Sequence, residues 1–392
     1  MDLEVNMSHA PNIAVLVELS NSHARGLIRG VSRYAQTHGP WKLHLLEHLR
    51  PKDIHRCLRT WQCAGLIAKV KTPAIAQQLC ETDIPVVNVS GTTTIGRWRR
   101  VDTDDSAVCW MAVSHLLDRG YRSFGFCGMP RYEWSRRRAG LHAAELARRE
   151  MICHSIELPS LTFETSLSQK DRSRLVQWIA GIPKPAGILA CGDYCGRFVL
   201  EVCAEAEVAV PDAVGVIGID NDEAICELCN PPLSSIESNS DQIGYAAAET
   251  LAQLLRGTPL ESWEILIKPT KLVGRRSTDA AAVGDPVVAE AIRFIRAYAS
   301  GDLAVVEIAR HVRVSRRYLE QQFRAVLGRS IFSEILRVRL ETAQRLLSET
   351  DWKLDVIAER AGFKHASRMS AAFLKKLGFR PGQYRRKMQN RD

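Results

Sequence analysis

The sequence predicts an α/β protein in which a two-lobed region built on parallel sheets is followed by an all-α domain with two helix-turn-helix units. Between residues 13 and 271, short apolar runs alternate with amphipathic stretches of helical period, which is typical of parallel strands joined by helices. Beyond residue 275 the strand-like runs stop and only helical periods remain. The 392 residues also exceed one ordinary core, so two or three domains are expected.

The alternation places each expected element along the chain. A Gly- and Ala-rich stretch separates the two regions. We expect a tail at 1–11, the two-lobed domain at 12–275, a linker at 276–286 and the helical domain at 287–392. Buried strands are predicted at 13–17, 63–68, 84–91, 123–128, 186–193 and 213–220, and helices at 26–39, 107–120, 138–150, 196–207 and 243–257.

The positive charge lies almost wholly in the helical domain. The formal net charge is +9; residues 285–392 contain 22 Lys and Arg against 12 Asp and Glu, and the other 284 residues contain 31 against 32. A basic domain attached to a near-neutral body is typical of a protein that binds nucleic acid. Charge alone leaves open a solvated basic domain with no polyanionic partner.

Composition also limits the compartment and the chemistry. The chain lacks the roughly 20 consecutive apolar residues of a membrane span, and MDLEVNMSHA lacks the apolar core of a signal peptide, so we expect a cytoplasmic protein with no membrane partner. The eleven cysteines are scattered, which favours reduced thiols. Cys226 and Cys229 have metal or dithiol spacing without a second ligand pair. With no Walker A, H-E-x-x-H or G-x-G-x-x-G motif, we expect no metal, no cofactor and no catalytic residue.

The helical domain contains two copies of one pattern, IARHVRVSRRYLEQQFRAVLG and IAERAGFKHASRMSAAFLKKLG. Each opens with Ile-Ala, turns, and enters a helix with an apolar pair four residues apart, Leu319 and Phe323 in one copy and Met369 and Phe373 in the other. Each copy is therefore predicted to be a helix-turn-helix unit. The residues between them predict a connecting helix of about 16 residues, roughly 24 Å long, which suits two DNA segments about one turn apart.

Two family resemblances rest on these residues. The repeat resembles the DNA-binding domain of the AraC/XylS transcription regulators, which also share the connecting-helix pattern and the closing residues. The first region resembles LacI-type and periplasmic sugar-binding domains, whose order is followed by VDTDDSAVCWMAVSHLLDRGYRSFGFCG, ILACGDYCGR, VGVIGIDND and IGYAAAETLAQLL. A sugar-binding domain in front of an AraC-type domain is similar to the architecture of the xylose operon regulators. The matching pattern residues are Arg339, Ala343, Leu346 and Leu347 in the connecting helix and Gly378, Pro381, Tyr384 and Arg385 at the close.

The resemblance implies a sugar-responsive transcription regulator. It implies D-xylose or a related pentose as effector, double-stranded DNA with repeated half-sites as partner, and a homodimer that activates transcription with RNA polymerase. Another sugar, repression in place of activation, or a sugar-metabolising enzyme with a basic accessory domain remain the alternatives. LacI-type relatives often have Gln at the position of Ser238, and the xylose group can have an acid at that of Ala24, which leaves the sugar's identity open.

A pentose pocket needs paired hydrogen-bond donors and acceptors and an aromatic face for the sugar ring. Polar residues that follow strands meet the first need, because ligands bind at the carboxyl ends of parallel strands. Asp220 follows a buried strand, and Arg137 matches the arginine that the sugar-binding families place at a helix start. For the other candidates helix capping or solvation is an equal alternative. The candidates are Ser20, Asn21, Arg25, Asp104, Trp134, Arg137, Asp193, Tyr194, Asp220 and Ser238.

The second helices of the two repeat copies differ on the face opposite their apolar pairs. The first copy presents Arg, Glu and Gln side chains that can reach base edges, although amphipathicity alone would produce the same face. The second presents Ser and Ala, which suit thymine methyl groups better than bidentate contacts, with cations at its ends for phosphates. The predicted DNA contacts are Arg316, Arg317, Glu320, Gln321 and Arg324, then Lys364, His365, Ser367, Arg368, Ser370 and Ala371.

Overall fold

The computed structural model describes residues 10–47, 50–70, 72–89, 98–162, 166–259, 262–279 and 285–389. Most of the expected tail and the middle of the expected linker lie outside these residues. The chain forms two compact units, residues 1–117 with 121–279, and residues 118–120 with 280–392. No helix within the described ranges is both long and apolar enough to cross a membrane.

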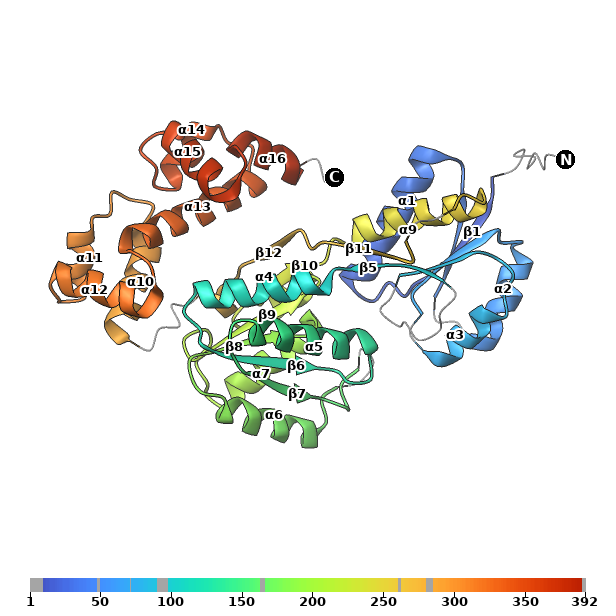
Figure 1. The fold of residues 1–392 in the computed structure, drawn as a ribbon, viewed down its shortest axis with the longest axis horizontal. Coiled ribbons are helices and arrows are strands. Elements are labelled where there is room, and N and C mark those ends of the chain that lie inside the picture. The colour runs from blue at the N-terminus through green and yellow to red at the C-terminus, as the bar shows by residue number, and fades with distance from the viewer. Residues whose placement is uncertain are drawn as a thin grey trace. The chain divides into compact units, whose positions relative to one another are not determined.

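The first lobe of the first unit has a sheet with α1 and α9 on one side and α2 and α3 on the other (Figure 1). The sheet is parallel and six-stranded, in the order β11-β5-β4-β3-β1-β2. Successive side chains of β1 enter two cores, since Ile13 packs against α1 and α9 while Ala14 packs on the other face with residues of α2 and α3. The elements are β1 (Asn12–Leu16), β2 (Lys42–Leu46), β3 (Gly65–Ala68), β4 (Val86–Asn88), β5 (Arg99–Thr103), β11 (Glu264–Ile267), α1 (Ser22–His38), α2 (Ile54–Thr60), α3 (Pro73–Cys80) and α9 (Ser240–Leu255).

The second lobe has a six-stranded sheet in the order β12-β10-β9-β8-β6-β7, in which only β12 runs antiparallel to its neighbour. Its strands are β6 (Ser123–Gly128), β7 (Cys153–Glu157), β8 (Ala186–Ala190), β9 (Val214–Ile219), β10 (Ser234–Glu237) and β12 (Lys271–Val273). Its helices are α4 (Asp105–Asp118), α5 (Glu133–Ala147), α6 (Gln169–Gly181), α7 (Asp193–Glu205) and α8 (Glu223–Leu228). The two parallel-sheet lobes expected from the sequence are thus confirmed.

The chain passes between the two sheets at three points among the described residues, after β5, after β10 and between β11 and β12. The three segments lie together, because Asp104 N donates to Ile267 O at 2.8 Å and Thr270 N donates to Glu237 O at 3.0 Å. Two candidate sugar residues, Asp104 and Ser238, therefore lie on the segments that join the lobes.

The predicted helices begin later in the sequence than those of the structure. For example, the helix predicted from residue 138 begins at Glu133, and the one predicted from residue 26 begins at Ser22. The prediction followed apolar periodicity, whereas first turns are polar: Asn21 caps α1 by accepting from Ala24 N at 2.9 Å. The apolar pattern detects the middle of a helix better than its start.

The second unit consists of helices (Figure 1). Its two helix-turn-helix units have separate cores. The predicted apolar pairs of both copies are fully buried. The two helix-turn-helix units share the connecting helix α13, which has 19 residues where about 16 were expected; Ser330 caps its start and its last residue is Glu349. The helices are α10 (Pro286–Tyr298), α11 (Val305–His311), α12 (Arg316–Leu327), α13 (Ile331–Glu349), α14 (Leu354–Arg360), α15 (Ala366–Leu377) and α16 (Pro381–Gln389).

The repeat extends to the helix ends. Gly328 and Gly378 end α12 and α15 in the left-handed region, at φ 67° and 74°, and each donates its N–H to the carbonyl four residues earlier at 3.0 Å. Glycine adopts this conformation without the steric cost of a Cβ atom. The two second helices are therefore both 12 residues long.

Candidate functional site

A cluster of polar side chains from both lobes lies where strands β1, β9 and β10 end; we call it the lobe junction, consisting of Ser22, His23, Arg25, Asp220, Asp222 and Ser238. His23, in the first turn of α1, places Nδ1 3.1 Å from Ser238 Oγ and 3.5 Å from Asp220 Oδ1. Asp220 has φ 98°, a backbone conformation that is costly for a residue with a Cβ atom and is common at functional sites. Sequence reasoning selected Asp220 and Ser238 but missed His23.

Asp220 is held in its charged form. Burial alone would raise its pKa, but His23, Arg138 and Lys69 together hold the pKa of this carboxyl well below its usual range. A charged carboxylate is a strong hydrogen-bond acceptor, so it suits the hydroxyls of a sugar. Asp220 thus provides one of the hydrogen-bond acceptors that a sugar pocket needs.

Asp222 makes a second connection between the lobes. Its Oδ2 accepts from Ser22 N at 2.8 Å and from Arg25 Nη2 at 3.3 Å. Arg25 also donates to Leu19 O at 3.1 Å, within its own loop. The start of α1 is therefore tied to the turn after β9. Arg25 was a candidate and Ser22 and Asp222 were not, although the repeated acids of the IDND turn were a possible signal.

Asp193 is placed beneath this turn. It is buried, and burial raises its pKa well above the usual range. Its Oδ1 accepts from Ser235 Oγ at 2.5 Å, and its Oδ2 accepts from Asp222 N at 2.7 Å. Both carboxyl oxygens thus hold the ends of neighbouring strands together. Its neighbour Tyr194 lies edge-on to Phe198, with ring centroids 5.4 Å apart.

The arginine pair at the start of α5 connects the remaining candidates. Arg137 donates to Asp102 at 2.9 Å and to Asp105 at 2.6 Å, while the buried Arg138 donates to the other oxygen of Asp105 at 2.7 Å and to Cys191 O at 2.6 Å. The guanidinium of Arg138 also lies 5.0 Å from the centroid of the Trp134 ring. Because Arg138 also acts electrostatically on Asp220, it links this pair to the lobe junction.

Other candidates serve local structure. Asn21 caps α1, as described above, and Asp104 Oδ1 accepts from Ala107 N at 3.0 Å in the first turn of α4. Ser20 is exposed in the loop between β1 and α1. Capping was the stated alternative for such residues, and the structure shows that two of them do cap.

Cys226 and Cys229 are both buried. Burial raises the pKa of the Cys229 thiol to about 11 and that of Cys226 further, whereas a metal ligand or nucleophile must be a thiolate. Among the described residues, no group of three or more His, Cys, Asp or Glu side chains is arranged to hold a metal ion.

In the second unit, α12 presents long polar side chains to solvent. Arg317, Gln321 and Arg324 are exposed, and Arg316 pairs with Glu320 one turn away at 2.8 Å. The pair is 61% and 43% exposed, so water screens it and it costs little to break. The face predicted from the sequence is therefore accessible to a ligand.

In α15 the corresponding face is short. Ser367, Arg368 and Ala371 are exposed and Ser370 is partly buried, while His365 occupies the N-cap position. Lys364 contacts Asp302 at 3.1 Å, with both side chains exposed. The contrast between the two helices expected from the sequence is present in the accessible side chains.

Comparisons with known proteins match the whole series of domains. Residues 12–97 match the XylR N-terminal domain, residues 113–278 a periplasmic binding protein-like domain and residues 308–387 a helix-turn-helix domain. The chain is 29% identical over 385 residues to the xylose operon regulatory protein of Escherichia coli K12, covering 95% of this chain and 96% of that protein. It is 28% identical to the protein of the same name in Haemophilus influenzae, covering 95% and 97%.

Solved structures agree. A structure of the xylose-binding transcription activator XylR aligns with TM-score 0.64 and 28% identity, covering 96% of this chain and 98% of that one. A periplasmic binding protein/LacI regulator from Alkaliphilus metalliredigens, complexed with D-xylulofuranose, aligns with TM-score 0.54 and 20% identity over 69% of this chain and 99% of that one; it shows the fold of the first unit alone. The resemblance predicted from the sequence is thus confirmed along nearly the full chain.

Proposed function

We propose that this chain, which has the domain order and the length of the xylose operon regulators it resembles, is a sugar-responsive DNA-binding transcription regulator that activates pentose genes. The observation that carries the proposal is that one chain holds both a two-lobed unit with a charged junction and a repeated helix-turn-helix unit. A sugar-metabolising enzyme has no use for the second unit, and a purely structural DNA-binding protein has no use for the first. The proposed location is the cytoplasm, where such a regulator meets DNA.

The lobe junction, together with Arg137, Arg138 and Trp134 of α5, is the proposed sugar site. Asp220 supplies a charged acceptor, Arg137 and Arg138 supply donors, and Trp134 supplies an aromatic face. His23 lies in the first lobe and Asp220 in the second, with Nδ1 and Oδ1 3.5 Å apart, so a sugar bound there also contacts both lobes. Binding then stabilises the closed arrangement of the lobes over an open one, which shifts the population of the two states.

D-xylose is the proposed effector, on the basis of the relatives' names. A small pentose suits a junction in which His23 occupies the space next to Ser238. Calorimetry with D-xylose, L-arabinose and D-ribose tests this. We expect D-xylose to bind most tightly; tighter binding of another pentose would change the effector without changing the class of protein.

The helix-turn-helix units are the proposed DNA readers. Arg317, Gln321 and Arg324 on α12 read base edges, whereas α15 contributes Ser and Ala contacts between cations that position it on phosphates. A homodimer would bring four such helices to repeated half-sites. RNA polymerase is the proposed partner for activation.

A mobility-shift experiment tests the proposal as a whole. The probe is a duplex enriched by the full chain from a randomised library, measured with and without D-xylose. We expect sequence-specific binding whose affinity changes about 5- to 150-fold with the sugar, the usual range of allosteric coupling. Binding without sequence preference, or without response to any sugar, contradicts the proposal. Conversion of the sugar into a product would favour the enzyme alternative.

A further inference from the structure

The two helix-turn-helix units depend on α13 for their relative position. The first half of α13 contributes Ile331, Ile335 and Val338 to the first core, and its second half contributes Ala343 and Leu347 to the other. A single helix that joins two small cores can bend. Any further connection between the units therefore determines how rigid the pair is.

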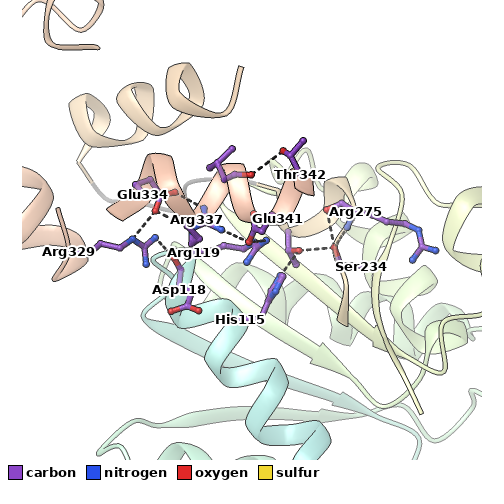
Figure 2. A network of polar contacts seen from close by, with 12 residues as sticks. His115, Asp118, Arg119, Ser234, Arg275, Arg329, Glu334, Arg337, Glu341 and Thr342 are labelled. Atoms are coloured by element: carbon purple, nitrogen blue, oxygen red, sulfur yellow. Dashed lines mark hydrogen bonds and ion pairs between the residues drawn. The ribbon is translucent and has the colours of Figure 1, made fainter. Parts of the chain in front are cut away.

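The first half of α13 is fixed to the first helix-turn-helix unit by charge. Glu334 is fully buried and contacts Arg329 at 2.8 Å and Arg337 at 2.5 Å (Figure 2). Burial alone would raise the pKa of this carboxyl, but the two arginines hold the pKa below its usual value. A buried carboxylate with two cationic partners is costly to move. Because Arg329 lies in the connection from α12, the first half of α13 moves with the first helix-turn-helix unit, and any bending would occur beyond it.

Arg339 connects the middle of α13 back to the end of α10. Its Nε donates to Ala299 O at 2.7 Å and its Nη2 donates to Gly301 O at 2.8 Å. Ala299 is the C-cap of α10, where helix geometry leaves carbonyls without a helical partner and where a cation is favoured by the helix dipole. The planar guanidinium can bridge the two carbonyls at once.

The turn of the second helix-turn-helix unit packs against the carbonyl of Ala299. Gly362, between α14 and α15, has φ +83°, and a Cβ atom there would lie 2.3 Å from Ala299 O and 2.8 Å from Arg339 Nε. The backbone of the second helix-turn-helix unit thus contacts the end of α10, and no space remains for a side chain at Gly362. Lys364 and Asp302 add an exposed ion pair beside this contact, which contributes little.

We propose that Arg339 and Gly362 fix the distance and the rotation between α12 and α15, and so set the base-pair spacing that the protein accepts between its two DNA segments. The inference rests on the proposed DNA-binding function and goes beyond it by assigning spacing selectivity to a contact that faces no base. Arg339 is a positioning residue. It acts through Ala299 and the turn of the second helix-turn-helix unit.

The physical reason is the geometry of the duplex. One added base pair moves the second segment by about 3.4 Å along the axis and by about 34° around it. A pair of units joined at two places cannot follow this movement, whereas a pair joined by α13 alone can bend toward it. Loss of the contact made by Arg339 and Gly362 should therefore relax the spacing requirement more than it weakens DNA binding by either helix-turn-helix unit.

The test uses the full chain and the duplex enriched by the wild-type protein, with its two contacted segments located by hydroxyl-radical footprinting. Three derivatives have one base pair inserted between the segments, one deleted, or the second segment scrambled. For the wild type we expect insertion or deletion to cost about 10-fold or more in affinity, within the usual cost of a base-pair mismatch. For Arg339→Leu we expect less than about 3-fold, with unchanged binding to the scrambled duplex.

Arg345→Leu is the matched control, because it removes the same charge from an exposed position of the same helix; it should keep the wild-type penalty. Arg339→Lys, which keeps the charge but loses the planar fork, should be intermediate and provides the test if the Leu variant fails to fold. A folded Arg339 variant that discriminates spacing as strongly as the wild type, or a wild type that tolerates the insertion, overturns the inference. Absence of any sequence-specific binding by the wild type would instead contradict the proposed function.

Discussion

The charges of the first unit and those of the recognition helix α12 are held in opposite ways. In the Arg138–Asp105 pair the two side chains are 7% and 1% exposed, whereas in the Arg316–Glu320 pair they are 61% and 43% exposed. A buried charge destabilises the folded state if it loses its partner. In an exposed pair, either side chain can exchange its partner for water or a ligand at little cost. The same residue types therefore maintain structure in the first unit and remain available for binding on α12.

The comparison is tested most strongly at Arg138. Arg138→Met removes the buried partner of Asp105 and a cation that acts on Asp220, while keeping similar bulk. Leaving a buried charge without its partner costs about 3–5 kcal/mol, so we expect the free energy of unfolding of the first unit to fall by that amount. Urea unfolding, followed by tryptophan fluorescence, measures it.

Arg136→Met provides the control on the same helix, since Arg136 is exposed and donates to a backbone carbonyl, Pro130 O, at 2.5 Å. We expect it to change stability by less than about 0.5 kcal/mol. Equal losses for the two arginines would show that burial does not distinguish them, and the comparison between the units would fail.

His142 tests a buried group that makes no hydrogen bond within the described part of the chain. It is fully buried in α5, neither ring nitrogen has a hydrogen-bond partner among the described residues, and burial lowers its pKa from 6.5 to about 4. The unfolded chain therefore binds a proton more readily than the folded one between these values. Above pH 6.5 the ring is neutral in both states and does not lower the stability of the fold. As the pH falls from 6.5 to 4, the free energy of unfolding decreases by about 3 kcal/mol through this group.

His142→Leu should remove this part of the pH dependence. Unfolding free energies measured between pH 4 and 7 should then vary less for the variant than for the wild type by about that amount. His154→Leu is a control in the same lobe, on the partly exposed strand β7. A wild-type slope that persists in His142→Leu would place the acid sensitivity in other groups.

Asp220 should affect the ligand more than the fold. Asp220→Asn keeps the shape but removes the charge that His23 and Arg138 stabilise. Hydrogen bonds to a charged group are worth about 1.5–3 kcal/mol, so we expect D-xylose affinity to fall about 10- to 150-fold in calorimetry. Asp212→Asn, at an exposed position of the same lobe, should bind the sugar as the wild type does. Unchanged affinity in Asp220→Asn would remove Asp220 from the sugar site.

Sequence patterns predicted the two sheets, the helical repeat and the contrast between the recognition helices because each depends on local periodicity. They missed β2, β5, β7, β10, β11 and β12, short strands whose sequences mix polar with apolar residues; β2, β7, β11 and β12 are also edge strands, which bury fewer of their side chains. An apolar run is a reliable signal for strands that are buried on both faces and a weak one for the rest.

The candidate site was less accessible to prediction because its geometry is made by residues far apart in the chain. His23 meets Ser238 across 215 positions and Asp193 meets Ser235 across 42. Of the adjacent arginines, the sequence favoured Arg137, although Arg138 is the more deeply buried. Residue type and position after a strand identified the right loops, but only the fold shows which oxygens are already occupied.

The smallest expected effects distinguish α12 from α15. Arg317→Ala should weaken binding by about 1–3 kcal/mol at particular base positions, measured as the loss of discrimination between the enriched duplex and single-base variants. Ser367→Ala on α15 should cost less than about 1 kcal/mol, since a hydroxyl makes no bidentate contact. Neither change should alter unfolding, because both side chains are exposed. A uniform loss over all sequences for Arg317→Ala would mark a phosphate contact, and a larger loss for Ser367→Ala would reverse the assignment of the main reader from α12 to α15.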